Sequence, residues 1–152
     1  MDLPQDSFGF LIADLSRLMR QAYQQRTGAS SLTLAQARAL LYVARHEGIR
    51  QVDLAGLLEV QPITLARLID HLHQEGLVER RSDPSDRRVY RLHVTPAATT
   101  RLQAIREVVA KVRADVLRNI EPENAALVLA TLNRMRNNLL AHSRNSQGGN
   151  EQ

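Results

Sequence analysis

Apolar side chains recur every three or four residues along most of this chain, which is the spacing of a helix that buries one face. The first such stretch spans residues 7–27, and its stripe consists of Phe8, Leu11, Leu15, Leu18 and Ala22, widened by Ile12, Met19 and Tyr23. After a break at residues 28–31, Thr33 is placed to cap a second helix that stops near Gly48. The pattern predicts two helices in the first third of the chain.

Shorter helical pieces follow from Gln51 onward. The spacing predicts one helix over residues 51–58 and another over about 62–75, and Pro62 suits the first turn of the second piece because its missing N–H costs nothing there. Val60 lies in the tight connection, where an apolar residue is expected between crossing helices. These features predict a helix, a buried corner and a second helix.

The next segment has the alternation of a strand. Residues 77–81 and 89–94 flank a turn rich in Ser, Asp and Pro, and the second piece places on one face Tyr90, Leu92 and Val94. We expect these two strands to form a β-hairpin whose apolar face lies against a core.

Two further helices are predicted after the hairpin. Thr95 followed by Pro96 is a strong helix start, and the fifth helix carries Leu102, Ile105, Val109, Val112 and Val116. Pro122 opens a sixth helix, whose stripe consists of Val128, Leu132, Met135 and Leu139. Residues 144–152 are polar and are expected to form a flexible tail. The fold class expected is mainly α, an α+β winged helix with a two-stranded wing and long flanking helices.

Composition narrows the functional classes. A chain of 152 residues with 43% apolar residues can bury a sizeable core, and no run approaches the roughly 18 apolar residues of a membrane span. Asp2 and Asp6 stand where a signal peptide would need basic and then apolar residues, so a cytoplasmic protein is expected. The absence of cysteine excludes disulfides, a thiolate zinc site and a thiol nucleophile.

The basic residues are almost all arginine. Of the 20 basic side chains only Lys111 is a lysine, and the segment from Arg80 to Arg91 holds five arginines against two aspartates. Arginine binds phosphates and guanine edges in a bidentate way. A charge run alone is more often a solvated face, so its structural context has to decide between the two interpretations.

That context favours duplex DNA. Two helices at a tight corner followed by a hairpin make a winged helix-turn-helix, in which the second helix enters the major groove and the wing reaches the adjacent minor groove. The second short helix leaves outward Thr64 and Arg67, which can bond base edges or phosphates, and Ile63, which can touch a thymine methyl group. The alternative is a polar, solvent-facing helix.

The central run QVDLAGLLEVQPITLARLIDHLHQEGLVERRSDPSDRRVYRLHVTPA resembles the winged-helix core of the MarR/SlyA family of bacterial transcriptional regulators. The segments TLARLIDHL, EGLVERR and DPSDRR carry the resemblance, which extends over about residues 7–143. It implies a homodimer on a pseudo-palindromic operator, with a DNA-binding lobe at 33–95 and a helical dimerisation region at 7–32 and 96–143.

The resemblance also assigns roles to individual residues. Thr64 and Arg67 match major-groove contacts, and Arg87 matches the arginine that enters the minor groove. Asp86 resembles the carboxylate that orients nearby arginines. The complete set of DNA-binding residues expected here is Gln61, Pro62, Ile63, Thr64, Arg67, His71, Arg81, Asp86, Arg87 and Arg88.

Three positions depart from the family pattern. Glu59 stands in the corner where a small residue or glycine is common, Gln61 occupies a cap position often held by serine, and Ala98 replaces a glycine. These departures bear on the geometry of the turn and on the docking of the fifth helix, whereas the fold class does not depend on them.

Relatives in this family hold small aromatic or phenolic acids near the junction of the two regions and then leave their operator. The residues that would line such a pocket are Leu15, Arg17, Met19, Tyr23, Arg38 and Tyr42. An arginine among them could pair with a carboxylate. The alternative, that Leu15, Met19 and Tyr23 are simple core, is the more common situation for such residues. The other regulatory hypothesis is a DNA-binding protein that acts by occupancy or anti-silencing without an effector.

Other functional classes have weak support. His71 and His73 are two residues apart on a helix and point in different directions, which is poor geometry for a metal. No nucleophile–base motif or phosphate loop is present, so neither catalytic residues nor a metal or cofactor is expected. The scattered aromatic residues disfavour binding of single strands by stacking, and the lack of cysteine excludes sensing of oxidants by a thiol.

Overall fold

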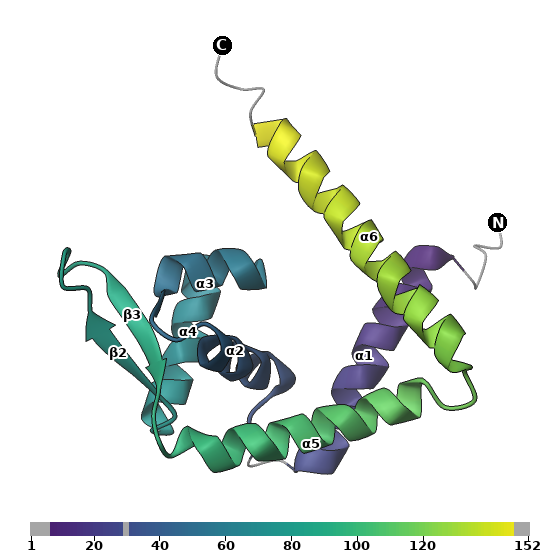
Figure 1. Cartoon of the computed structure of the whole chain (residues 1–152), viewed down its shortest axis with the longest axis horizontal. Coiled ribbons are helices and arrows are strands. Elements are labelled where there is room, and N and C mark those ends of the chain that lie inside the picture. Colours follow the sequence, from purple (N-terminus) through teal and green to yellow (C-terminus); the bar gives the residue numbers. More distant parts are fainter. Residues whose placement is uncertain (1–6, 29–30, 148–152) are drawn as a thin grey trace. The chain divides into compact units, whose positions relative to one another are not determined.

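A computed structural model of the chain describes residues 7–28 and 31–147. These residues belong to two compact units that divide after Arg113, and each unit is described by itself. The elements, in chain order, are α1 (Phe8–Thr27), α2 (Leu34–Arg45), β1 (Ile49–Arg50), α3 (Gln51–Leu58), α4 (Pro62–Gln74), β2 (Val78–Ser82), β3 (Tyr90–Val94), α5 (Ala98–Val116) and α6 (Pro122–Gln147) (Figure 1).

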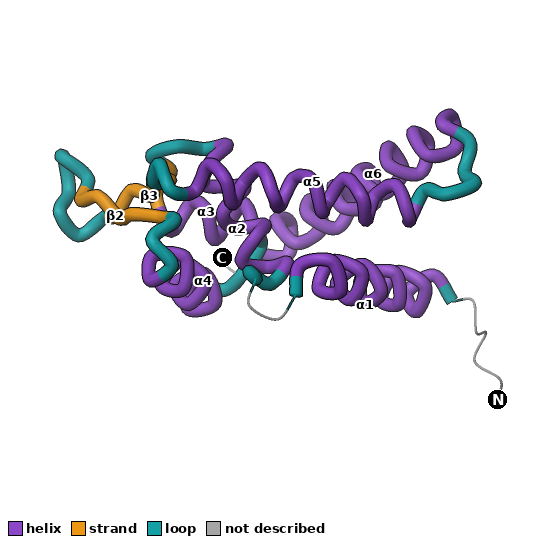
Figure 2. Tube along the Cα trace, turned by 90° about the horizontal axis from the view of Figure 1, so that it is seen from below, coloured by secondary structure: helices purple, strands orange, loops and turns teal. Residues whose placement is uncertain are grey.

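The first unit is a winged helix. Helices α2, α3 and α4 pack together and against a three-stranded antiparallel sheet of order β1-β3-β2 (Figure 2). The side chains that fill this core are fully buried and come from every layer: Leu40, Val43, Leu54, Leu65, Ile69, Leu72, Val78 and Leu92. Helical spacing thus places one face of each short helix in a common core, as the apolar pattern predicts.

Helix α2 begins with a complete capping box. The backbone N–H of Gln36 donates to the Thr33 hydroxyl at 3.2 Å, and the Thr33 N–H donates to the Gln36 side-chain carbonyl at 2.9 Å. Two backbone groups that the helix cannot satisfy internally are thereby satisfied. The prediction that Thr33 caps this helix is confirmed.

The corner between α3 and α4 requires a left-handed residue. Glu59 adopts φ 56° and ψ 42°, which allows the Val60 N–H to donate to the Ala55 carbonyl at 3.1 Å and close the end of α3. Val60 is half-buried against the core, as expected for this corner. Glycine is favoured in this conformation, so Glu59 occupies a position that suits it poorly.

The sheet differs from the predicted hairpin in two respects. A third strand, β1, pairs through Ile49 and Arg50 with Leu92 and Arg91 of β3. Two residues are too few for an alternation of apolar and polar side chains to be recognised, so the sequence did not predict this strand. In β3 only Leu92 is fully buried, whereas Tyr90 is 48% exposed because it lies at the end of the strand next to the wing turn.

The expected cap of the fifth helix was wrong in detail. Thr95 does not cap α5. Its hydroxyl donates to the Gly76 carbonyl at 2.6 Å, and the helix begins at Ala98 after one turn closed by the Ala98 N–H and the Thr95 carbonyl. The side chain of Thr95 thus links the end of the hairpin to the end of α4. Ala98 itself is fully buried.

The long helix α1 exposes most of its apolar stripe. Only Tyr23 is buried, and the exposed members are Phe8, Phe10, Leu11, Ile12, Leu15, Leu18 and Met19. Within the described residues of the second unit, α6 exposes Leu127, Val128, Leu129, Leu132 and Leu139. Isolated surface leucines are ordinary, but a continuous stripe is typical of a face that another surface covers.

Helix α6 extends to Gln147 and so includes residues 144–147, the first four of the expected tail. Residues 148–152 of that predicted tail lie outside the described part of the chain. None of the helices in the described ranges has the length and apolar character that crossing a membrane requires.

Candidate nucleic-acid interface

The N-terminal turns of α4 form an exposed polar surface. Gln61, Pro62, Ile63 and Thr64 are exposed at the start of the helix, and Arg67 follows one turn later on the same side. Ile63 is 65% exposed, which is unusual for a large aliphatic side chain beside a well-filled core. The opposite side of α4 is fixed by buried leucine and isoleucine, so the helix cannot rotate this surface inward.

The first turn of α4 is also open to an anion. Gln61 occupies the N-cap position but its side chain makes no capping hydrogen bond, and Pro62 stands at the first helical position. The backbone N–H groups of that turn have no partner within the helix, and the helix dipole makes this end electropositive. A DNA phosphate is one anion that such a helix start can accept.

The side chain of Arg80 joins α4 to the wing, the hairpin formed by β2 and β3. Its Nε donates to the Gln51 side-chain carbonyl at 3.1 Å, and its Nη2 pairs with the Asp70 carboxylate at 2.5 Å. One side chain of β2 therefore contacts the start of α3 and the middle of α4. Because the Arg80 side chain is only 22% exposed, its charge is committed to the fold more than to solvent.

Asp83 organises the turn of the wing. It is 5% exposed and accepts hydrogen bonds from the Ser85 backbone N–H at 2.8 Å, the Ser85 hydroxyl at 2.5 Å and Arg91 Nε at 2.6 Å. The bonds from Ser85, and then that from Arg91, hold the pKa of Asp83 well below its ordinary value of 3.8. Arg91 also donates to the Gly48 carbonyl at 2.9 Å, which anchors the wing to the loop before β1.

The wing tip presents two arginines. The Arg88 side chain is 92% exposed and its Nε lies 3.3 Å from the Asp86 carboxylate, which also accepts from the Arg88 backbone N–H at 3.0 Å. Arg87 is exposed and forms no ion pair with any described residue. The expected role of Asp86, orienting a neighbouring arginine, is consistent with this geometry.

The outer face of the sheet carries balanced charge. Arg81 and Arg91 lie directly opposite each other on β2 and β3, an arrangement of like charges that is unfavourable by itself. Each has its own carboxylate: Arg81 pairs with Glu79, its Nε donating at 2.8 Å, and Arg91 pairs with Asp83. Arg81, although exposed, therefore has an acidic partner on its own strand.

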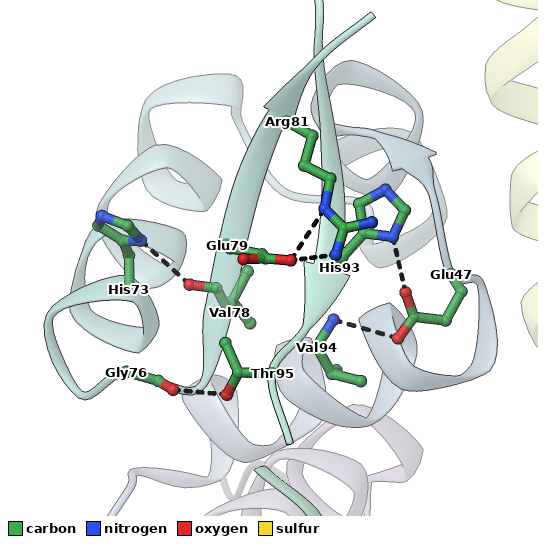
Figure 3. A network of polar contacts seen from close by, with 9 residues as sticks. All are labelled: Glu47, His73, Gly76, Val78, Glu79, Arg81, His93, Val94 and Thr95. Carbon is green, nitrogen blue, oxygen red and sulfur yellow. Dashed lines mark hydrogen bonds and ion pairs between the residues drawn. The ribbon is translucent and has the colours of Figure 1, made fainter. Parts of the chain in front are cut away.

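Polar contacts at the base of the wing hold both strands in place (Figure 3). Glu47, before β1, accepts the Val94 backbone N–H at 3.1 Å and contacts His93 Nδ1 at 3.0 Å. On the other strand, His73 of α4 donates from Nδ1 to the Val78 carbonyl at 3.0 Å, which fixes the tautomer of that ring. The hairpin is thus joined at its base to both the α2–β1 loop and helix α4.

A groove brings the helix start and the wing together. It has a volume of about 280 Å³ and is lined by Gln51, Val52, Ala55, Pro62, Arg88, Val89 and Tyr90. Pro62 from α4 and Arg88 from the wing are 26 positions apart in the sequence but share this groove. One predicted DNA-binding residue of the helix, Pro62, and one of the wing, Arg88, therefore line the same groove.

Sequence reasoning missed the residues that hold this surface in shape. Arg80, Asp83 and Arg91 were counted only as part of a charge run, yet each makes a contact that fixes the wing. The order Asp-Pro-Ser at residues 83–85 could have indicated Asp83, because an aspartate two residues before a serine commonly accepts that residue's backbone N–H. No local signal identifies the distant partners of Arg80.

The six residues expected to line an effector pocket do not gather at one place. Arg38 lies over the Tyr42 ring at 5.5 Å, while Arg17 contacts Asp14 at 3.3 Å on α1. Leu15 and Met19 are exposed on α1, whereas Tyr23, one turn after Met19, is buried. Within the described chain no group of three or more His, Cys, Asp and Glu side chains could hold a metal ion.

The fold and this surface define a winged helix-turn-helix protein. Residues 32–90 match the model of the MarR family. The crystal structure of MarR is 26% identical to this chain, covers 95% of this chain and 99% of its own, and superposes with a TM-score of 0.83. The predicted resemblance to the MarR/SlyA family is confirmed by this match and by the shared fold.

Two further solved structures share the fold. The structure of BpsR from Bordetella bronchiseptica, which concerns regulation of its DNA binding by 6-hydroxynicotinic acid, is 19% identical, covers 90% of this chain and 97% of its own, and has a TM-score of 0.82. A mutant MarR from E. coli, complexed with operator DNA, is 22% identical, covers 89% and 99%, and has a TM-score of 0.80.

Proposed function

We propose that this chain is a homodimeric, sequence-specific regulator of transcription that binds double-stranded DNA and acts as a repressor released by a small ligand. The observation that carries the proposal is the groove that the open start of α4 shares with the wing arginine Arg88, next to which Arg87 is also exposed. A helix of this kind enters the major groove while the wing reaches the neighbouring minor groove.

Ion pairs and exposure distinguish the arginines that hold the fold together from the arginines that we expect to contact DNA. Of the five arginines in the wing segment, Arg80 and Arg91 are held by carboxylates inside the fold and Arg81 pairs along its strand. Arg87 and Arg88 project from the tip, and Arg67 projects from α4. Three cations are thus presented on the surface, and phosphate contacts of this kind supply most of the sequence-independent affinity for a duplex.

The exposed apolar stripes support the dimer. The stripe of α1 contains Phe8, Leu11, Leu15 and Leu18, which would remain in water in a single chain. Covering them with a second copy removes this cost, and two-fold symmetry would then present two α4 helices to half-sites about one helical turn apart. A mutant MarR from E. coli, which shares this fold, forms a complex with operator DNA, and this supports the DNA-binding part of the proposal.

Repression and release by a ligand complete the proposal. Support comes from BpsR, a similar fold whose DNA binding is regulated by 6-hydroxynicotinic acid. An effector-free regulator that acts by occupancy remains the other hypothesis, and titration of ligands against the bound operator separates the two.

A duplex-binding assay tests the central claim. The DNA is a set of duplexes selected from a random pool, together with the promoter next to the gene for this chain. These duplexes are titrated with wild type and with Arg67→Ala and Arg87→Ala. The control variant is Arg106→Ala, which removes an exposed arginine from α5. Arg67→Ala should relax preference at one base position by about 1–3 kcal/mol, and Arg87→Ala should lower the slope of log K against log salt by about one.

The affinity of the control variant is compared with that of wild type. Arg106→Ala should bind like wild type, because that arginine is outside the α4–wing surface. Equal affinity of all four proteins for duplex DNA would contradict the assignment. Sedimentation at the concentrations used tests the dimer. Wild type that sediments as a monomer at concentrations at which it binds a palindromic site would contradict that part of the proposal.

A further inference from the structure

A single carboxylate in the loop between α2 and β1 holds the end of strand β3. Glu47 accepts the Val94 backbone N–H through one oxygen at 3.1 Å and contacts Nδ1 of His93 through the other at 3.0 Å (Figure 3). Beside it, the Gly48 N–H donates to the Leu92 carbonyl at 2.9 Å. The loop therefore continues the short pairing of β1 with β3, and we refer to Glu47, His93 and Val94 as the β3 clamp.

The contact between Glu47 and His93 changes in character with one proton. An ionised carboxylate can only accept hydrogen bonds, so Nδ1 of His93 is the donor. A neutral ring gives an ordinary hydrogen bond, whereas a protonated ring gives an ion pair, and charge-assisted bonds of this kind are roughly twice as strong. Histidine is the side chain whose charge ordinarily changes between about pH 5 and pH 8. Mild acidification therefore strengthens the β3 clamp.

The other charged groups around His93 are already paired with one another. Glu79 of β2 lies directly opposite His93 in the antiparallel register, so a protonated ring has a carboxylate on each of two sides. The cations of the same sheet face have acidic partners of their own. They are Arg81 of β2, Arg91 of β3 and Arg50 of β1, and their partners are Glu79, Asp83 and Asp53. The His93 side chain is 22% exposed, so a proton can reach the ring from solvent.

A series of hydrogen bonds connects the clamp to the turn of the wing. Gly48, the residue after Glu47, accepts a hydrogen bond from Nη1 of Arg91 at 2.9 Å, and Nε of the same guanidinium donates to Asp83 at 2.6 Å. Asp83 in turn accepts the backbone N–H and the hydroxyl of Ser85. One loop thus restrains β3 at its base and, through Arg91, the turn that presents the exposed arginines of the wing tip.

We propose that Glu47 and His93 are positioning residues for the wing, and that protonation of His93 raises the affinity of this protein for duplex DNA as the pH falls from about 8 to about 6. A wing held in one orientation loses less conformational freedom when it binds, and this preorganisation increases affinity. Neither residue needs to touch DNA. The inference rests on the proposed function, because the duplex reports the orientation of the wing.

Other histidines gain charge over the same pH range and determine the controls. His71 belongs to the DNA-binding residues expected on α4, where protonation would add a cation at the duplex itself. His46, which ends α2 and is exposed, precedes Glu47, and its ring centroid lies 6.1 Å from that of Tyr42. Variants at these two positions, compared with His93→Gln, separate the clamp from the general effect of added positive charge.

The first experiment measures the affinity of the full chain for the selected duplex by fluorescence anisotropy at constant ionic strength, at about pH 6 and about pH 8. In His93→Gln the ratio of the two affinities should fall about threefold relative to wild type, a modest factor because the ion pair is partly exposed. His46→Gln should keep the wild-type ratio. Adding His93→Gln to His71→Gln should lower the ratio by the same factor, because the two side chains lie on different elements.

Glu47→Gln separates the charge of the clamp from its shape. Glutamine retains an oxygen that can accept the Val94 N–H but cannot form an ion pair with His93. The pH ratio of this variant should fall as far as that of His93→Gln, while its affinity at about pH 8 stays close to that of wild type. A loss of affinity by the same factor at both pH values would show a structural role alone and would overturn the proton-sensitive clamp.

The second experiment measures proton uptake when the duplex binds. Calorimetric titrations at about pH 7 in two buffers of different ionisation enthalpy give the number of protons taken up. By reciprocity, a proton that strengthens DNA binding is itself bound more tightly in the complex, so wild type should take up more of a proton than His93→Gln. Circular dichroism at each pH establishes that the variants are folded.

The outcomes distinguish this inference from the proposed function. An unchanged pH ratio in either His93→Gln or Glu47→Gln, or equal proton uptake by wild type and His93→Gln, would overturn the clamp. Failure of wild type to bind any duplex at either pH would instead contradict the proposed function. If His93→Gln does not fold, Glu47→Gln alone decides, because Glu47 is exposed and lies outside the core.

Discussion

Replacing Glu59 with glycine is expected to stabilise the winged helix by about 0.5–1 kcal/mol. Glu59 has φ 56° and ψ 42°, a left-handed conformation that costs a residue with a Cβ about 1–2 kcal/mol. Glycine removes that cost, but its greater conformational freedom in the unfolded chain destabilises the folded state by about 0.5–1 kcal/mol. The difference between these two terms gives the expected gain.

The side chain of Glu59 contributes little to set against this gain. It is exposed and forms no ion pair with any described residue, so the backbone dominates the result. Glu59→Ala is the matched control, because it removes the carboxylate and keeps the Cβ that causes the strain. It should stay within about 0.5 kcal/mol of wild type, as surface substitutions usually do.

The assay is thermal and urea unfolding followed by circular dichroism at one fixed protein concentration, because a dimer's stability depends on concentration. The glycine variant should unfold about 1–4 °C higher than wild type. A glycine variant less stable than wild type, or an alanine variant that gains as much as glycine, would refute the reasoning from the left-handed corner.

Two further substitutions test other parts of the fold. Thr33→Ala removes the capping box of α2 and should cost about 1 kcal/mol of unfolding free energy; Thr33→Ser should retain most of it, and equal losses for both would contradict a capping role. Asp83 has a lowered pKa, so its stabilisation is complete above the ordinary value of 3.8 and is lost as the pH falls below it. Asp83→Asn should therefore be less stable than wild type at pH 6, with the gap shrinking toward pH 2, and a gap independent of pH would rule out the ionised carboxylate as its cause.

The helices and their buried faces could be predicted from sequence because each is a local property. The spacing of Leu65, Ile69 and Leu72 predicts which side of α4 is buried, and the structure buries all three. The outward position of Thr64 and Arg67 follows from the same geometry. The cap at Thr33 could be predicted in the same way, because it is also a local feature of the sequence.

Contacts between distant residues could not be predicted in this way. The two-residue strand β1 exists only because β3 lies beside it, and the cap expected of Thr95 was replaced by a bond to Gly76, 19 positions earlier. Tyr23 and Arg101, which are 78 positions apart in the chain, line one pocket, and no local pattern associates them. No short-range pattern encodes such pairs.

The arginines of the wing show which properties follow from the sequence and which follow from the tertiary structure. By itself the sequence determined that five arginines lie within one hairpin, and that a helix with an outward Arg67 precedes them. Only the tertiary structure decided that Arg80 and Arg91 are held by Asp70 and Asp83, while Arg87 and Arg88 remain outside. The physical reason is that a partly buried cation needs a nearby carboxylate, and which carboxylate is near depends on how the helices and strands pack.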